Sequence, residues 1–169
     1  MTGRRTGRAL LAGGLLLGTL LASGCGVRPS PVITGRSAVS GPAQGVRLYL
    51  VAQGELVLVL RRPTVDDTPS EALARLAAGP QQDERSQGLT SEVPTGFTAV
   101  VEVTPTTVGS GDLTVRMTGT ARALSPTAID QVICTAVDAA AQAGRVGSLA
   151  PVTIVGSDGA QPARRCPAR

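Results

Sequence analysis

The sequence is 169 residues long, carries a formal net charge of +4, and contains no His, one Tyr and one Phe. Without His, the chain cannot build a Ser–His–Asp or Cys–His catalytic arrangement, and it lacks the side chain that most often acts as a base near neutral pH. Because no run of basic residues alternates with aromatic ones, surfaces that track phosphates and stack bases are missing, and nucleic acid is not an expected partner.

The N-terminal part has the three regions of a secretory signal. Arginines occur among residues 1–8, an uncharged and mostly apolar run covers residues 9–21, and small residues lead to Cys25. The run is shorter than the roughly 20 apolar residues that span a bilayer. A Cys directly after Ser23 and Gly24 resembles the lipobox of bacterial lipoproteins, although Ala22 stands where a large aliphatic residue is preferred.

This resemblance implies that residues 1–24 are a signal peptide and that the Cys25 thiol takes a diacylglycerol, which holds the protein on the outer face of the cytoplasmic membrane. The alternatives are an ordinary signal peptide with an incidental Cys, or an uncleaved anchor. Removing residues 1–24 takes three Arg from the 16 basic residues and leaves the 12 acidic ones, so the mature net charge is about +1. Residues 25–44, rich in Gly, Pro and Ser, are then a flexible linker or, alternatively, a recognition segment.

Residues 45–158 are expected to form the folded domain. Two β-rich runs, 46–51 and 55–60, flank Gln53-Gly54, which predicts a hairpin. Both runs are apolar at nearly every central position. This pattern favours strands that are covered on both faces or lie in the centre of a sheet.

A helix is predicted to begin at Thr68, because Thr68, Pro69 and Glu71 together make a capping box with Pro at the first helical position. Its apolar face is formed by Leu73, Leu76 and Ala77. Gly79 and Pro80 are expected to end it. The polar stretch 81–96 is predicted to be a loop that contains a turn at 93–96.

Two more strands are predicted at 98–104 and 112–118, joined by a Gly-Ser-Gly turn. A second helix begins at Ser125 and Pro126, and its apolar residues recur at helical spacing: Ile129, Val132, Ile133, Ala136, Val137 and Ala140. Gly144 ends it, and a strand at 152–155 precedes a tail at 159–169. The order β-β-α-β-β-α-β predicts a single small α+β domain, a mixed sheet with two helices packed on one face.

Two segments together resemble the GerMN domain: residues 72–80, a helix that ends in Gly-Pro, and residues 88–96, a loop with Gly-Leu and Pro-x-Gly. Tyr49 in the first strand fits as well, and the stretch after Asp112 matches less closely. GerMN domains occur in bacterial envelope lipoproteins, including actinobacterial ones, and are regarded as binding or assembly modules. The resemblance therefore implies a structural role and provides no catalytic residues.

Two cysteines remain beside Cys25, and export would place them where disulfides persist. Cys134 lies at the border of the apolar face of its helix, and Cys166 lies in the tail. We therefore predict a Cys134–Cys166 disulfide. The alternatives are a buried, inert Cys134 and a free Cys166.

No catalytic residue, metal site or cofactor is predicted. Asp66-Asp67 is the only adjacent acid pair, and its place before a helix favours a solvated loop over a catalytic or metal role. The chain is expected to be a non-enzymatic, membrane-anchored envelope lipoprotein that binds an envelope protein or copies of itself. The alternatives are a lipoprotein that binds a small ligand or a wall polymer, and an envelope hydrolase that uses two carboxylates.

Overall fold

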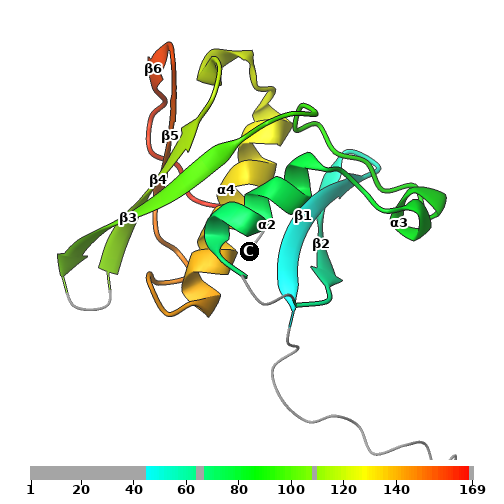
Figure 1. The fold of residues 1–169 in the computed structure, drawn as a ribbon, viewed down its shortest axis with the longest axis horizontal. Coiled ribbons are helices and arrows are strands. Elements are labelled where there is room, and N and C mark those ends of the chain that lie inside the picture. Colours follow the sequence, from blue (N-terminus) through cyan, green and yellow to red (C-terminus); the bar gives the residue numbers. More distant parts are fainter. Residues whose placement is uncertain (1–44, 64–66, 108–109, 168–169) are drawn as a thin grey trace, which may run out of the picture. The chain divides into compact units, whose positions relative to one another are not determined.

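The computed structural model describes residues 45–63, 67–107 and 110–167. The predicted signal peptide, Cys25 and linker lie outside these residues, and no helix within them is long and apolar enough to cross a bilayer. Figure 1 follows the chain through its elements: β1 (Val46–Ala52), β2 (Glu55–Arg61), α2 (Pro69–Ala77), α3 (Gln82–Ser86), β3 (Ala99–Thr107), β4 (Ser110–Met117), the 3₁₀ turn η1 (Ala121–Ala123), α4 (Pro126–Gln142), β5 (Val152–Gly156) and β6 (Gly159–Ala160).

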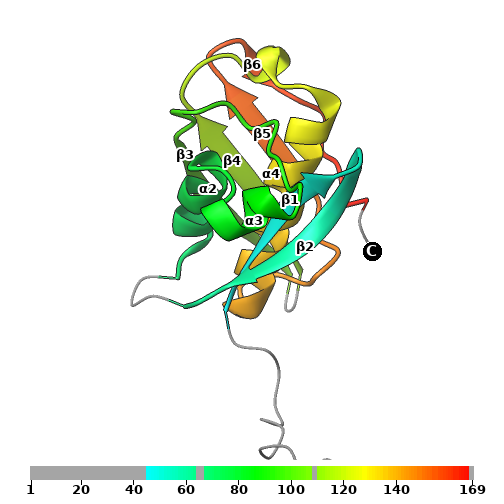
Figure 2. The ribbon, with the colours of Figure 1, turned by 90° about the vertical axis from the view of Figure 1, so that its right-hand side faces the viewer.

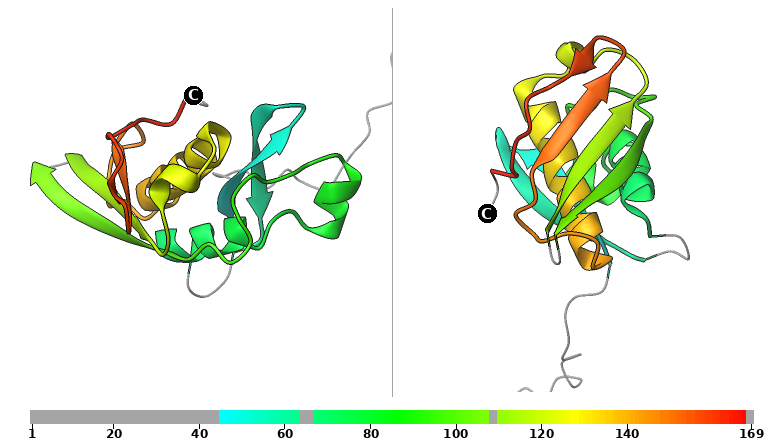
Figure 3. Two further views of the ribbon diagram at one scale, coloured as in Figure 1. Left: turned by 90° about the horizontal axis from the view of Figure 1, so that it is seen from above. Right: turned by 90° about the vertical axis from the view of Figure 1, so that its left-hand side faces the viewer.

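These elements form three layers. One layer is a mixed sheet in the order β3-β4-β5-β6, in which β4 and β5 run parallel and the other pairs antiparallel. Another is the β1–β2 hairpin, a separate two-stranded sheet. Figure 3 shows α2 and α4 between the two sheets. The predicted α+β class and mixed sheet are therefore confirmed, and the hairpin forms a sheet of its own.

The predicted hairpin is present, with an unbroken register from Val46↔Arg61 to Ala52↔Glu55. Its turn residues Gln53 and Gly54 have positive φ values of 52° and 86°, the backbone of a type I′ turn that matches the twist of the strands. The expectation that both strands are covered is correct for β1 only. β1 lies against the helices, whereas Val57, Leu58 and Leu60 of β2 are exposed.

The residues that the sequence predicts to begin and end α2 do so in the structure. The Thr68 hydroxyl accepts a hydrogen bond from the Glu71 N–H at 3.2 Å, and Gly79 takes the left-handed conformation just after the helix. The polar stretch after Pro80 was expected to be a loop, but it contains the short helix α3. Gln81 is the N-cap of α3, and the Glu84 carboxylate accepts a hydrogen bond from the Gln81 N–H at 2.6 Å. This capping box was not revealed by the apolar pattern.

α4 is buried more completely than a one-sided apolar stripe predicts, since every residue from 131 to 140 is buried. The middle-layer position explains this, because the helix is covered by the mixed sheet on one side and by β1 and α2 on the others (Figure 3). The helix contributes Val132, Ile133 and Val137 to the core, which also includes Leu48, Leu50, Leu73, Leu113 and Ile154. Burying one such side chain contributes roughly 1.5–3 kcal/mol.

Candidate binding surface

β2 is an edge strand whose outer backbone groups point away from β1. The hairpin is two-stranded, so β1 is the partner strand of β2 among the described residues. In an antiparallel ladder, alternate residues direct their N–H and C=O groups to opposite sides. Tyr49 and Val51 of β1 direct theirs away from β2, because they bond to other parts of the chain. Their partners Leu58 and Leu56 therefore direct their own N–H and C=O groups away from β1, and so does Leu60, two residues further on. We call this outward row of backbone groups the β2 edge.

The opposite edge of the hairpin is closed by hydrogen bonds. The Tyr49 N–H donates to the Thr135 hydroxyl at 3.2 Å, and the Gln131 amide donates to the Tyr49 carbonyl at 2.8 Å. Val51 exchanges backbone hydrogen bonds with Thr90, at 2.9 and 2.8 Å. Polar side chains of α4 thus take the place of a neighbouring strand, which explains why Gln131 and Thr135 are buried in the middle of the helix.

The edges of the mixed sheet are also protected. In β3, the Val101 N–H donates to the Ser70 hydroxyl of α2 at 3.0 Å, Pro105 has no N–H, and the register shifts between Pro105 and Thr107. β6 at the other side is only two residues long. Proline, irregularity and short length are the usual ways in which proteins prevent an edge from pairing with another chain. The β2 edge has none of these features over residues 56–60.

The side chains of β2 are apolar and partly exposed. The exposed fractions are 37% for Val57, 48% for Leu58 and 45% for Leu60, and no charged residue interrupts the run from Leu56 to Leu60. Apolar runs of this length do not reveal whether a strand is covered by its own domain or left open. The sequence therefore predicts the strand but not its place at the edge of a sheet.

An open groove of about 1300 Å³ lies beside the β2 edge. Figure 2 faces this side of the domain, with α3 next to β2. β2 and the residue that follows it supply residues 57–62 to one wall, and the end of α2 with α3 supplies the other. We call it the β2 groove; its second wall is formed by Glu71, Arg75, Ala78, Gly79, Pro80, Gln81, Asp83, Glu84, Gln87 and Leu89. An extended segment that lay along β2 would thus meet strand backbone and apolar side chains together.

A buried ion pair holds the two walls of the β2 groove together. The Arg61 guanidinium donates to both carboxylate oxygens of Glu84, at 2.9 and 2.6 Å, and the two side chains are only 9% and 7% exposed. Arg61 also donates to the carbonyls of Arg75 and Gly79, at 3.3 and 2.9 Å. One residue of β2 therefore satisfies acceptors at the end of α2 and binds the carboxylate that caps α3.

The Arg61 hydrogen bonds hold the pKa of Glu84 below its ordinary value of 4.5. Burial acts in the opposite direction, and the hydrogen bond from the Gln81 N–H adds to the lowering. The carboxylate is thus charged at neutral pH and is bound on both sides. We regard the Arg61–Glu84 pair as a fixed structural part of the groove, since both of its charges are already satisfied within the domain.

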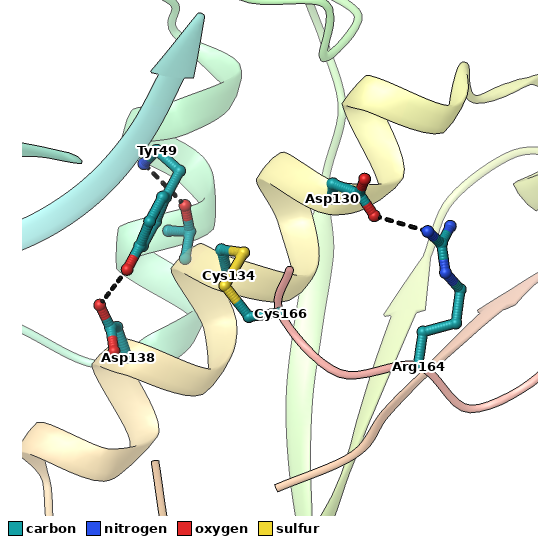
Figure 4. Close-up of a disulfide and its surroundings, with 7 residues drawn as sticks. Tyr49, Asp130, Cys134, Asp138, Arg164 and Cys166 are labelled. Carbon is teal, nitrogen blue, oxygen red and sulfur yellow. Dashed lines mark hydrogen bonds and ion pairs between the residues drawn. A yellow bond between two sulfur atoms is a disulfide. The ribbon is translucent and has the colours of Figure 1, made fainter. Parts of the chain in front are cut away.

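The structure joins Cys134 of α4 to Cys166 of the tail, with an S–S distance of 1.99 Å and a Cα–Cα distance of 4.7 Å (Figure 4). Arg164 exchanges backbone hydrogen bonds with Val152 of β5, at 2.8 and 3.0 Å, and its side chain pairs with Asp130 at 2.8 Å. The tail is therefore held by a covalent bond, a strand-like contact and an ion pair.

Asp67, the described member of the Asp66-Asp67 pair, does not lie in the β2 groove. Its carboxylate pairs with Arg75 at 3.3 Å and lies just before α2. Asp66 is outside the described residues. Within the described part of the chain, no group of three or more His, Cys, Asp or Glu residues could hold a metal ion.

The sequence was compared with protein-family models and with curated proteins, and the structure with solved structures, and none of the three comparisons gives a match.

Proposed function

We propose that this protein is a non-enzymatic, lipid-anchored module of the bacterial envelope that binds a protein partner through the β2 edge. One observation supports the proposal: among the described residues, the β2 edge is apolar, unprotected and beside an open groove, whereas β3 contains a proline and a register shift and β6 has only two residues. Such an edge can take an extended segment as an additional strand, with main-chain hydrogen bonds for affinity and side-chain contacts for specificity. The exposed leucines add apolar surface that a partner would bury.

The place of action is supported by the N-terminal sequence. An apolar run, small residues and Cys25 resemble a lipoprotein signal, and residues 26–44 would connect the anchor to the domain. The resemblance of residues 72–80 and 88–96 to the GerMN domain supports the same kind of role, since that family is regarded as one of binding or assembly modules. The disulfide also suits an exported protein.

Changing Cys25 to Ala is expected to block lipid attachment and maturation, because the thiol is the atom that the lipid modifies. Each buried CH₂ of a lipid chain contributes about 0.8 kcal/mol, so a diacyl anchor gives stable attachment where one chain does not. Mass spectrometry of the membrane fraction should detect a diacylated N-terminal Cys25 in the wild type and an unprocessed chain in the variant. Detection of a mature, membrane-bound wild type without lipid would contradict the lipoprotein assignment.

A photoreactive phenylalanine analogue at position 58 is expected to give covalent adducts when the full-length chain is irradiated in membranes. The β2 edge would bring the partner into contact with this side chain. Position 100 is the matched control, because Val100 is also exposed (58%) but belongs to the mixed sheet. If adducts form at position 100 and not at position 58, the binding surface does not lie at β2. If adducts form at neither position, the proposed binding role is wrong.

A further inference from the structure

The sequence of β2 is nearly symmetrical about Leu58. Reading outward from this residue, Val57 and Val59 are equivalent, and so are Leu56 and Leu60. Glu55 and Arg61 then carry opposite charges at the two ends. An antiparallel copy of the same strand therefore meets like with like along the apolar run.

We propose that the partner bound by the β2 edge is the same strand of a second copy of this chain, paired antiparallel about a two-fold axis at Leu58. This inference deepens the proposed binding function and rests on it. The two hairpins would form one continuous sheet in the order β1-β2-β2-β1. A two-fold axis makes the contact self-complementary, which is how most soluble homodimers form.

The alternation of outward and inward backbone groups along β2 fits this axis. Leu58 directs its N–H and C=O outward, so two copies of Leu58 can exchange both hydrogen bonds. Leu56 also presents outward groups, and it comes opposite Leu60 of the second copy. All outward groups of the β2 edge are then paired.

The ends of the strand are compatible with the same register. Glu55 comes opposite Arg61 of the second copy, so no like charges face each other, and the Arg61 guanidinium remains bound to Glu84 of its own domain. Moving the axis to Leu56 would place the turn residue Gly54 opposite Leu58, and moving it to Leu60 would place Arg62 opposite Leu58. The axis at Leu58 is thus favoured over its neighbours by the apolar pairs.

Attachment to a common membrane would assist this pairing. A contact made by one strand from each copy is small beside the roughly 800 Å² per partner of a standard interface, so we expect weak association in dilute solution. Anchors in one membrane would raise the effective concentration of one copy near another. The pairing should therefore be tested with the full-length chain in its membrane.

The test is disulfide formation by full-length Leu58→Cys after mild oxidation of membranes, analysed on non-reducing gels. Across the proposed axis, the two Cα atoms at position 58 would lie about 5.5 Å apart, within the range of a disulfide. We expect a covalent dimer that is several-fold more abundant than in Val100→Cys, the exposed control in the mixed sheet, and than in the parent chain with its own cysteines. A double variant with Leu56→Cys and Leu60→Cys should also dimerise, because these positions face each other in the proposed register.

The outcomes separate self-pairing from binding in general. If Leu58→Cys forms no more dimer than Val100→Cys, while the photoreactive group at position 58 attaches to a different protein, self-pairing is wrong and the binding function stands. If neither probe at position 58 gives an adduct, both proposals fail. If Leu58→Cys forms a dimer but the double variant with Leu56→Cys and Leu60→Cys does not, the proposed register is wrong, and so is the axis.

Discussion

Replacing Arg61 with Ala should lower the free energy of unfolding by about 3–5 kcal/mol. The change leaves the Glu84 carboxylate buried without its counter-ion, and it also removes the donors to the carbonyls of Arg75 and Gly79. Chemical denaturation with the disulfide intact would measure the loss. We also expect the α3 wall of the β2 groove to loosen, which hydrogen exchange of residues 82–86 would detect.

Arg116→Ala is the matched control for this prediction. Arg116 pairs with Glu102 at 2.9 Å, the same distance as one of the Arg61 contacts, but the two side chains are 56% and 48% exposed. Exposed pairs contribute only about 0–1 kcal/mol. If Arg61→Ala and Arg116→Ala lower the free energy of unfolding by the same amount, burial of the Arg61–Glu84 pair has no energetic importance.

The pH dependence gives a second control. The folded-state pKa of Glu84 is lowered, so its ionised form stabilises the fold above the ordinary value of 4.5, and this contribution is lost as the pH falls through the folded-state pKa. Once Glu84 is protonated, Arg61→Ala no longer leaves a buried charge. The difference in the free energy of unfolding between wild type and Arg61→Ala should therefore become smaller below pH 4.5. A difference that does not change with pH would contradict this explanation.

The second large effect is expected from removing the disulfide. Changing both Cys134 and Cys166 to Ala should destabilise the protein by about 3–4 kcal/mol on the chain-entropy model, given the separation of 32 residues. Thermal or chemical unfolding would measure the loss, and hydrogen exchange at Arg164 should rise as the tail detaches from β5. Partner binding should persist, because the bond lies away from β2. Two free thiols in the unfolded, unreduced mature protein would disprove the disulfide itself.

The parts of the fold that local chemistry determines could be predicted. The sequence predicts Thr68 and Ser125 as N-caps, and Gly79 and Gly144 as the residues that end the two main helices, because each signal acts within one turn of the chain. The hairpin followed in the same way from Gln53-Gly54 between two apolar runs. These elements need little information from the rest of the protein.

The parts that depend on three-dimensional neighbours could not be predicted. Nothing in residues 55–61 distinguishes a strand inside a sheet from one at its edge, and exposure is decided by where the helices pack. The groove depends on Arg61 meeting Glu84, 23 positions along the chain, and α3 itself is too short and polar for a periodic signal. Gln131 and Thr135 are buried for a similar reason, since they bond to a strand far away in the sequence.

The buried contact of Tyr49 gives this protein a built-in optical reporter. Tyr49 is the only tyrosine and there is no tryptophan, so phenol fluorescence arises from one position. Its hydroxyl donates to the Asp138 carboxylate at 2.8 Å, at the contact between β1 and α4 (Figure 4). Emission from Tyr49 would therefore report whether the hairpin is seated on α4, without any added label. Followed during unfolding or partner binding, it would show whether the hairpin and the helix separate together with the rest of the domain or before it.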